Sequence, residues 1–279
     1  MVDKKWKLLK LHNWDYLTDV MEDRFLSIAM QAALEAGEII AKYFGKKHKF
    51  KYKNEDKSDF ATQADLESEQ KIIEIITKNF PTHSIIAEES GRDDKKSEYT
   101  WVIDPLDGTY SFSIGFPYFA VSIGLLKDNK PVLGALYHIK EDKLYTAQKG
   151  KGAFMNGQPI KVSSRNNLPQ AAIVVDLGSK PRRLPKIEMY ILPLIKELGH
   201  IYSIGSTALG MVLTACGVGD GTVAQAWVWD FVAAAIIVEE AGGKVTDFKG
   251  EEIDWSQDRL NVLASNGLIH DQIMEAIKK

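Results

Sequence analysis

The segment from residue 101 to residue 109 reads Trp-Val-Ile-Asp-Pro-Leu-Asp-Gly-Thr, and it constrains the fold of this 279-residue chain more than any other. Its apolar start has the composition of a buried strand, and Pro105 disfavours a helical backbone at Asp104. Gly108 can take backbone angles that other residues avoid, so a tight turn is expected directly after Asp107. The pattern predicts a buried strand that ends in two neighbouring carboxylates.

Two carboxylates on one turn indicate a binding chemistry. Mg2+ prefers oxygen ligands and usually keeps water and substrate phosphates in its shell, so Asp104 and Asp107 suit such a cation. The backbone N–H groups of Gly108 and Thr109 could bind a phosphate, especially if a helix begins there. The alternative is an ordinary surface turn, because Asp, Pro and Gly are common turn residues.

The pattern of apolar residues predicts helices and strands in a definite order. In the first half, apolar residues recur at helical spacing in two stretches, and β-type patterns follow. We expect helices at 25–43 and 62–80, a strand at 84–87, a charged loop at 92–98, and strands from 101 to about 162 with a hairpin turn at Asn156-Gly157. The lysine-rich segment 46–57 is interpreted as a solvated strand or hairpin.

In the second half, segments with the apolar spacing of strands alternate with segments that have the apolar spacing of helices. We expect strands at 171–175, 200–203, 221–225 and 261–264, and helices at 184–198 (despite Pro185 and Pro193), 206–216, 231–241 and at the C-terminus. The first half is rich in strands, and strands and helices alternate in the second half. This order predicts layers of sheets and helices, with an α+β first half that leads into an α/β second half. We divide the chain into an N-terminal arm (1–21) and two halves (22–165 and 166–279) that form one compact catalytic unit.

Composition excludes several classes of protein. The net charge of −3 does not support a general nucleic-acid binder. The single cysteine excludes an intrachain disulfide. No long apolar run predicts a membrane span, and no secretion signal is recognised, so we expect a cytoplasmic protein.

Other acids occur where they could join Asp104 and Asp107. Glu88 and Glu89 follow a short apolar strand, and Asp230 opens an alanine-rich helix, where simple helix capping is the alternative interpretation. A helix from residue 62 would place Thr62 and Asp65 on one face. Carboxylates brought so close would repel each other strongly unless cations intervene, and this repulsion argues for bound metal.

The segment from Asp104 to Thr109, with Phe112, resembles the central motif of the inositol monophosphatase family of Mg2+-dependent, lithium-sensitive phosphatases. Further matching segments occur in the family's order at 87–90, 115–117 with 120–123, 150–157, 229–230 and 240–243. The resemblance covers residues 22–277. It implies a layered αβαβα sandwich of the sugar-phosphatase type and a homodimer, as is common among relatives.

The resemblance also implies roles for individual residues. One Mg2+ would be held by Glu88, Asp104 and the Leu106 carbonyl. A second would be held by Asp104, Asp107 and Asp230, and Glu88 would contribute to a weaker third site. Thr109, oriented by Asp65, would help to activate a water, with Glu88 also in the catalytic set. Gly108 and Thr109 would bind the phosphate, and the residues expected to contact the rest of the substrate are Ser179, Gly205, Ser206, Thr207, Gln225 and Asp230.

The expected substrate is a small phosphorylated polyol or sugar, with myo-inositol monophosphate first. Inositol-hydrolysing relatives often carry a glutamate before the Trp-Asp pair, whereas this chain has Gln225. Arg182 and Arg183 could instead bind a second phosphate, as in fructose 1,6-bisphosphate, although a solvated basic loop is the alternative. Other sugar or nucleotide phosphates, and a non-catalytic module that binds phosphate esters, also remain open.

Overall fold

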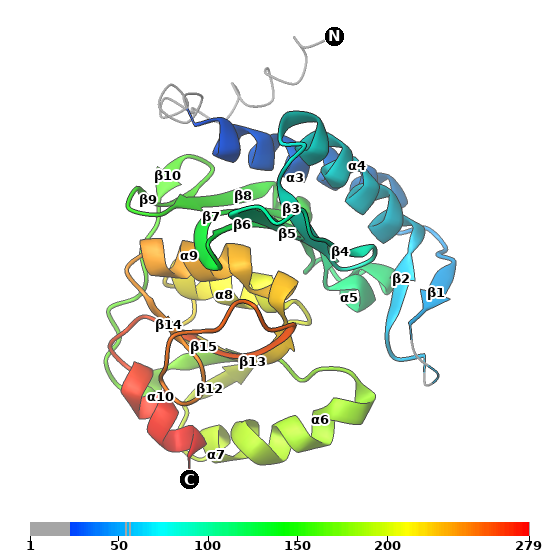
Figure 1. The fold of residues 1–279 in the computed structure, drawn as a ribbon. Coiled ribbons are helices and arrows are strands. Elements are labelled where there is room, and N and C mark those ends of the chain that lie inside the picture. Colours follow the sequence, from blue (N-terminus) through cyan, green and yellow to red (C-terminus); the bar gives the residue numbers. More distant parts are fainter. Residues whose placement is uncertain (1–22, 54, 56, 279) are drawn as a thin grey trace.

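The computed structural model describes residues 23–53, 55 and 57–278, so the expected N-terminal arm lies outside the described residues. The chain folds into five layers, helices and sheets in alternation (Figure 1). A pair of helices covers an eight-stranded sheet, two central helices separate that sheet from a five-stranded one, and further helices cover the outer face. The predicted layered αβαβα fold is confirmed.

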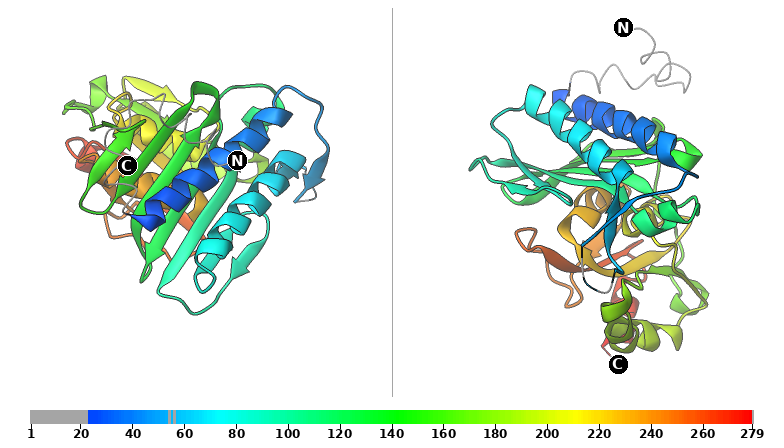
Figure 2. Two further views of the ribbon diagram at one scale, coloured as in Figure 1. Left: turned by 90° about the horizontal axis from the view of Figure 1, so that it is seen from above. Right: turned by 90° about the vertical axis from the view of Figure 1, so that its right-hand side faces the viewer.

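The outer helix pair consists of α3 (Arg24–Tyr43) and α4 (Gln63–Asn79), as predicted. Asp23 begins α3 by accepting hydrogen bonds from the backbone N–H groups of Phe25 (3.0 Å) and Leu26 (3.3 Å), which are otherwise unpaired at a helix start. The apolar stripes of both helices pack on one face of the large sheet (Figure 2). In the sequence, a hairpin separates these two helices: β1 (Phe50–Tyr52) lies in the lysine-rich segment and β2 (Phe60–Thr62) follows it.

The eight-stranded sheet has the order β10-β9-β8-β7-β6-β5-β3-β4. Its strands are β3 (Ser84–Ala87), β4 (Gly91–Asp93), β5 (Tyr99–Asp107), β6 (Ala120–Lys127), β7 (Lys130–His138), β8 (Lys143–Gln148), β9 (Gly152–Met155) and β10 (Gln158–Pro159). Only the β3–β5 pair is parallel. The predicted loop at 92–98 is wrong at its start, because residues 91–93 pair with β3 as an edge strand.

The central helices are α8 (Thr207–Ala215) and α9 (Val232–Glu240). Every residue of α9 from Val232 to Val238 is buried, because this helix lies between the two sheets. Gly134 in β7 permits the close approach, since a Cβ there would lie 2.3 Å from the carbonyl oxygen of Ala233. An alanine-rich helix and a glycine in the facing strand therefore fix the spacing of these layers.

The five-stranded sheet has the order β12-β11-β13-β15-β14. Its strands are β11 (Ala172–Val175), β12 (His200–Tyr202), β13 (Gly221–Trp227), β14 (Lys244–Thr246) and β15 (Arg259–Ser265). The outer layer contains α10 (His270–Ile277) and a helical segment that differs from the prediction. Instead of one helix at 184–198, the chain forms α6 (Lys180–Lys186), a π-helical turn η3 (Ile187–Ile191) and α7 (Leu192–Ile195).

The two prolines explain the interruption of this segment. Pro185 and Pro193 have no backbone N–H and clash with the preceding turn, so a regular helix is disfavoured. The wider turn between them places Tyr190 and Ile191 in the outer core. The basic residues Arg182 and Arg183, for which a loop was the alternative, lie in α6.

Candidate active site

The first two carboxylates come from the end of β5. Asp104 pairs in register with Ser122 of β6 and Asp107 with Ala120, so the register shifts between the two acids. This irregularity follows from Pro105 and lets both side chains leave the strand on the same side. Both are buried, with exposed fractions of 1% and 6%. Asp104 also accepts a hydrogen bond from the N–H of Leu106 (2.9 Å).

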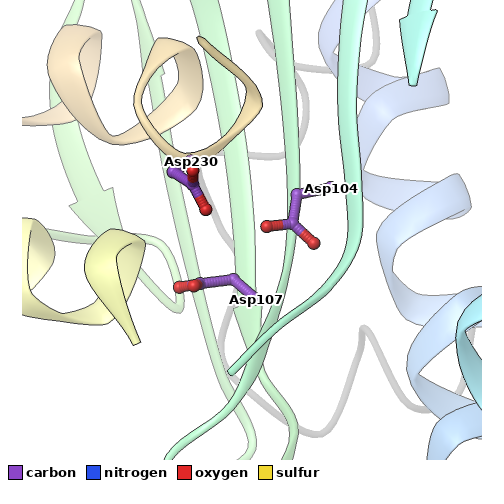
Figure 3. A group of neighbouring side chains, drawn as sticks. All are labelled: Asp104, Asp107 and Asp230. Atoms are coloured by element: carbon purple, nitrogen blue, oxygen red, sulfur yellow. The ribbon is translucent and has the colours of Figure 1, made fainter. Parts of the chain in front are cut away.

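The third carboxylate, Asp230, comes from the second half of the chain. It ends the short 3-10 turn η4 (Val228–Asp230), and its side chain accepts a hydrogen bond from the N–H of Trp227 (2.7 Å). Because α9 begins later, with Phe231 at its N-cap, the alternative interpretation of Asp230 as the cap of that helix is wrong. Asp104, Asp107 and Asp230 each offer an oxygen within 4.8 Å of the others (Figure 3).

The electrostatics of the three acids favour a bound cation. Burial raises the pKa of Asp104 well above its ordinary value, and the charges of Glu88, Asp107 and Asp230 raise it further. Burial likewise raises the pKa of Asp230, with Asp107 and Glu88 adding to the effect. The pKa of Asp107 rises to about 6, mainly through burial. Three oxygen donors whose ionised forms are destabilised fit a hard divalent cation, which would replace their protons.

Asp107 is held in place by the start of α8. Its carboxylate accepts hydrogen bonds from the hydroxyl of Ser206 and from the N–H groups of Thr207 (3.2 Å) and Ala208 (2.8 Å). These donors lower its pKa and oppose the effect of burial. The first N–H groups of a helix have no acceptor within the helix. The Asp107 carboxylate, which comes from the large sheet, is the acceptor for those at the start of α8.

Thr109 and Asp65 form a hydrogen-bonded pair beside the three aspartates. The Thr109 hydroxyl lies 2.9 Å from Asp65 Oδ1 and 3.0 Å from the carbonyl oxygen of Leu106. The other oxygen of Asp65 accepts bonds from the N–H (2.7 Å) and hydroxyl (2.5 Å) of Thr62, as the one-turn spacing suggested. Asp65 is fully buried, and burial raises its pKa to about 6. The fold thus joins a hydroxyl at the start of α5 (Thr109–Ser113) to a carboxylate on α4.

Gly108 is required by the turn that precedes α5. Its φ of 92° lies in the left-handed region. A Cβ at this position would also lie 2.9 Å from the carbonyl oxygen of Tyr118 and 3.1 Å from that of Gly205. The turn can therefore pack against the segment before α8 only if residue 108 has no side chain.

Glu88 reaches the same region, but a lysine also holds it. Lys53 Nζ lies 2.7 Å from Glu88 Oε1 and 2.5 Å from Glu89 Oε1. Burial acts to lower the pKa of Lys53, but the two glutamates reverse this effect and raise it. Burial raises the pKa of Glu89 to about 7, and the charge of Glu88 adds to the effect. Glu88 also hydrogen-bonds to Asp104, so it links the lysine to the aspartates.

A small cavity of about 20 Å3 adjoins Asp107. Gly205, Ser206 and Thr207 line it together with Asp176 of the loop after β11. Two other expected substrate contacts lie nearby in sequence but have different surroundings. Ser179 is the N-cap residue of α6, with no side-chain capping bond, and the Gln225 amide donates to Asn261 Oδ1 (2.8 Å). The cavity wall thus carries hydroxyl groups and one carboxylate.

Sequence reasoning missed several residues of the site. Lys53 lies in a lysine-rich stretch whose members look alike in sequence, so no signal distinguishes the one that meets Glu88. Lys186 is buried, with its ammonium bonded to Asp176 and to the carbonyl oxygen of Gln225 (2.6 Å). A lysine in a basic segment gives no sequence signal of burial. Asp176, at the end of a strand, could have been found by the criterion that identified Glu88.

Within the part of the chain that is described, no helix combines the length and the apolar character needed to cross a membrane.

Comparisons with known proteins agree with this geometry. The family described as "Inositol monophosphatase family" matches residues 21–279. A fructose-1,6-bisphosphatase/inositol-1-monophosphatase from Aquifex aeolicus is 38% identical over 92% of this chain and 96% of its own length. Inositol monophosphatase 3 from Solanum lycopersicum is 37% identical over 92% of this chain and 97% of its own. The solved inositol monophosphatase of Anabaena sp. PCC 7120 has a TM-score of 0.79 and 37% identity, covering 91% of this chain and 95% of its own.

Proposed function

This chain belongs to the inositol monophosphatase family and is a phosphoric monoester hydrolase of sugar or polyol phosphates, and we propose that myo-inositol monophosphate is its first substrate. The observation that supports this proposal is the convergence of three aspartates beside the Thr109–Asp65 pair. The aspartates provide a cation site, and the pair provides a hydroxyl next to a carboxylate. Both parts are needed to direct water at a phosphate ester.

We assign the metal ligands from the donors present. Asp104, Glu88 and the Leu106 carbonyl would hold one Mg2+, and Asp104, Asp107 and Asp230 a second, with Glu88 contributing to a weaker third. Asp104 is assigned to both ions because the charges of Glu88, Asp107 and Asp230 all act on it, in addition to its burial. Glu88 would have to release Lys53 before it could bind an ion with its full charge. When bound, Mg2+ would neutralise the phosphate oxygens and lower the pKa of water.

The protein groups orient the reactants. Thr109 would accept a hydrogen bond from the attacking water and pass its own proton toward Asp65, which is 2.9 Å away. The raised pKa of Asp65, about 6, makes this carboxylate a better proton acceptor at neutral pH than an ordinary aspartate. The N–H groups of Gly108 and Thr109, in the first turn of α5, would bind the phosphate. No covalent bond between protein and phosphate is required.

The leaving group would lie toward the cavity next to Asp107. Gly205, Ser206 and Thr207 line this cavity and are proposed to contact the polyol. Ser179, Gln225 and Asp230 are proposed as further contacts. Gln225 would replace the acid that inositol-hydrolysing relatives often carry. Its amide nitrogen donates to Asn261, and its side-chain carbonyl oxygen would accept a hydrogen bond from a substrate hydroxyl.

A second candidate is a sugar bisphosphatase, because two arginines meet beside Asp230 at the ring of Trp227. Other sugar or nucleotide phosphatases of the family are weaker candidates. A non-catalytic binding module would have no use for the Thr109–Asp65 pair. By the same family membership we propose a cytoplasmic homodimer that is inhibited by lithium.

A substrate panel tests the proposal. Phosphate release from myo-inositol 1-phosphate, fructose 1-phosphate and fructose 1,6-bisphosphate is measured with and without Mg2+. We expect Mg2+-dependent release that falls by orders of magnitude in Asp104→Asn but not in Asp93→Asn, which removes an exposed acid of β4. Binding without release would support the non-catalytic module, and full activity of Asp104→Asn at low Mg2+ would refute the assignment.

A further inference from the structure

A buried lysine joins two parallel strands beside the candidate active site. Lys186 of α6 is 3% exposed, and its ammonium bonds to the Asp176 carboxylate and to the backbone carbonyl oxygen of Gln225 (2.6 Å). Asp176 directly follows β11, and Gln225 lies in the parallel strand β13. The N–H of Asp176 continues the pairing of these strands by donating to the carbonyl oxygen of Val223 (3.2 Å). One ammonium group therefore holds the carboxyl ends of two neighbouring strands together.

The topology of the five-stranded sheet favours ligand binding at these strand ends. From β11 the chain passes through α6 and α7 to β12 on one side, and from there through α8 to β13 on the other side. The first connection covers the outer face of the sheet, whereas α8 covers the inner face (Figure 1). Open sheets of this kind bind ligands in the crevice outside the carboxyl ends of the strands, where such connections diverge. The Asp176–Lys186 pair lies at this crevice.

Asp176 lies on the face of the sheet that is directed toward the central helices. Side chains along a strand alternate between the two faces of a sheet. Ile173 and Val175 belong to the outer core, whereas Val174 lines the small cavity at the start of α8. Asp176 continues the alternation and lines the same cavity, together with Ser206. A lysine of the outer layer thus reaches an acid on the inner face.

The charge of Asp176 acts on the cation site, although Asp176 does not belong to it. Burial raises the pKa of Asp230 most, the charges of Asp107 and Glu88 raise it further, and the charge of Asp176 adds to them. Among the described residues, the group of acids spaced to hold one ion does not include Asp176. The Lys186 ammonium offsets the charge of Asp176, so this acid adds less repulsion to the cluster.

The Asp176 carboxylate can still accept hydrogen bonds from a ligand. Its Oδ1 accepts the N–H of Gly178 (2.7 Å), and its Oδ2 accepts the Lys186 ammonium. A carboxylate offers about four lone-pair sites, so each oxygen can accept one more bond. The side chain is 20% exposed. The adjoining cavity of about 20 Å3 exceeds the roughly 10–15 Å3 that one water molecule needs, so a hydroxyl group fits there.

We propose that Asp176 determines specificity by accepting hydrogen bonds from hydroxyl groups of the leaving group, and that Lys186 is the positioning residue that directs this carboxylate toward the cavity. This inference rests on the proposed function, because it places the phosphate of the ester at the three aspartates. Asp176 would supply from β11 the acid that β13 lacks at Gln225. Hydrogen bonds from hydroxyl groups to an ionised carboxylate are stronger than those between neutral groups. The site would therefore select phosphate esters of polyols over esters whose leaving group is apolar.

The test compares two phosphate esters that share a carbon ring and differ in its hydroxyl groups. For myo-inositol 1-phosphate and cyclohexyl phosphate, kcat and KM are measured with Mg2+ in the wild type, Asp176→Asn, Lys186→Met and Asp247→Asn. Asp247 is the matched control, because it also follows a strand, β14, and accepts the N–H group two residues later, that of Lys249 (2.8 Å). We expect the wild type to prefer the inositol ester at least tenfold in kcat/KM. Asp176→Asn and Lys186→Met should each reduce this preference about tenfold through KM, and Asp247→Asn should leave it unchanged.

The second ester separates a hydroxyl contact from a structural role. A weakened fold or cation site would slow both esters alike, whereas loss of the contact affects the inositol ester only. Lys186→Met leaves a carboxylate without its partner and can lose stability for that reason. The double variant Asp176→Asn with Lys186→Met removes both charges, so it should melt near the wild type and still lack the preference.

A measurement of binding does not depend on turnover. Added with Mg2+ and inorganic phosphate, myo-inositol should raise the melting temperature of the wild type and of Asp247→Asn, but not that of Asp176→Asn. A wild type without preference, or an unchanged preference in Asp176→Asn, would overturn the role of Asp176 and leave the proposed function standing. Phosphate release from neither ester and from no sugar phosphate would overturn the proposed function itself.

Discussion

Asp104→Asn should make the protein more stable when divalent cations are removed, although it destroys the proposed metal site. Asp104 is 1% exposed, and its pKa in the folded chain is raised well above 3.8, its ordinary value. Between its ordinary pKa and its raised pKa, Asp104 keeps a proton in the folded state that the unfolded state has lost. Each pH unit of this interval destabilises the folded protein by about 1.4 kcal/mol. Asparagine does not titrate, and its side-chain oxygen can still accept the N–H of Leu106.

The sign of the pH dependence follows from the raised pKa. Stability contributed by a group with a raised folded pKa is fully present below its unfolded pKa and is lost as pH rises. The advantage of Asp104→Asn over the wild type in EDTA should therefore be close to zero near pH 4 and grow toward pH 7. Urea denaturation at several pH values measures it, with Asp93→Asn as the control. An Asp104→Asn protein that is less stable than the wild type at pH 7, or a difference independent of pH, would refute the reasoning.

Excess Mg2+ should reduce the advantage of Asp104→Asn over the wild type. A ligand that binds only the folded state at 100 times its Kd adds about 2.7 kcal/mol. The wild type should gain this stability, and Asp104→Asn should gain little. An equal gain in both proteins would mean that Asp104 is not a metal ligand.

Three further predictions test neighbouring residues. Thr109→Val removes the hydroxyl bonded to Asp65 and should lower kcat by about 100-fold or more. Thr109→Ser keeps a hydroxyl and should keep most of the activity. Equal losses in both variants would exclude a role for the hydroxyl. Lys53→Met should tighten Mg2+ binding by about tenfold in calorimetry, or about 1.4 kcal/mol, because Glu88 no longer has an ammonium partner. The control Lys51→Met, which changes an exposed lysine, should have no effect. Weaker binding in Lys53→Met would show that this lysine assists metal binding. His270 is fully buried, and burial lowers its pKa from 6.5 to about 4, so the unfolded chain binds a proton that the folded chain does not between these values. The wild type should therefore lose up to about 3 kcal/mol of stability as pH falls through this window, and His270→Gln should lose less. Urea denaturation midpoints that change equally with pH in the two proteins would contradict this explanation.

Local sequence chemistry predicted the parts of the site that lie within one turn or one strand end. Pro105 and Gly108 restrict the backbone around Asp104 and Asp107, so the position of these acids at the end of β5 could be inferred. The spacing of Thr62 and Asp65 likewise indicated their contact. Such features depend on backbone preferences and helical periodicity, which act over a few residues.

Contacts that depend on the packing of layers could not be predicted in this way. Whether Lys53 or another lysine of its segment meets Glu88 depends on the twist and register of the β1–β2 hairpin. Arg259 reaches Trp227 only because β13 and β15 pair in one register. The π-helical turn follows from two prolines that the sequence shows, but the turn's extra width depends on where Tyr190 packs.

The division of the chain at residue 165 does not separate the chemistry of the site. Asp104 and Asp107 lie on the large sheet, whereas Asp230 and the helix start that holds Asp107 belong to the second half. In the same way, α9 belongs to the second half but packs on β7 of the first, where Gly134 admits it. Either half alone would expose one side of this shared core. We therefore propose that 22–165 and 166–279 fold as one cooperative unit, in which cation binding offsets the repulsion between acids that packing has brought together.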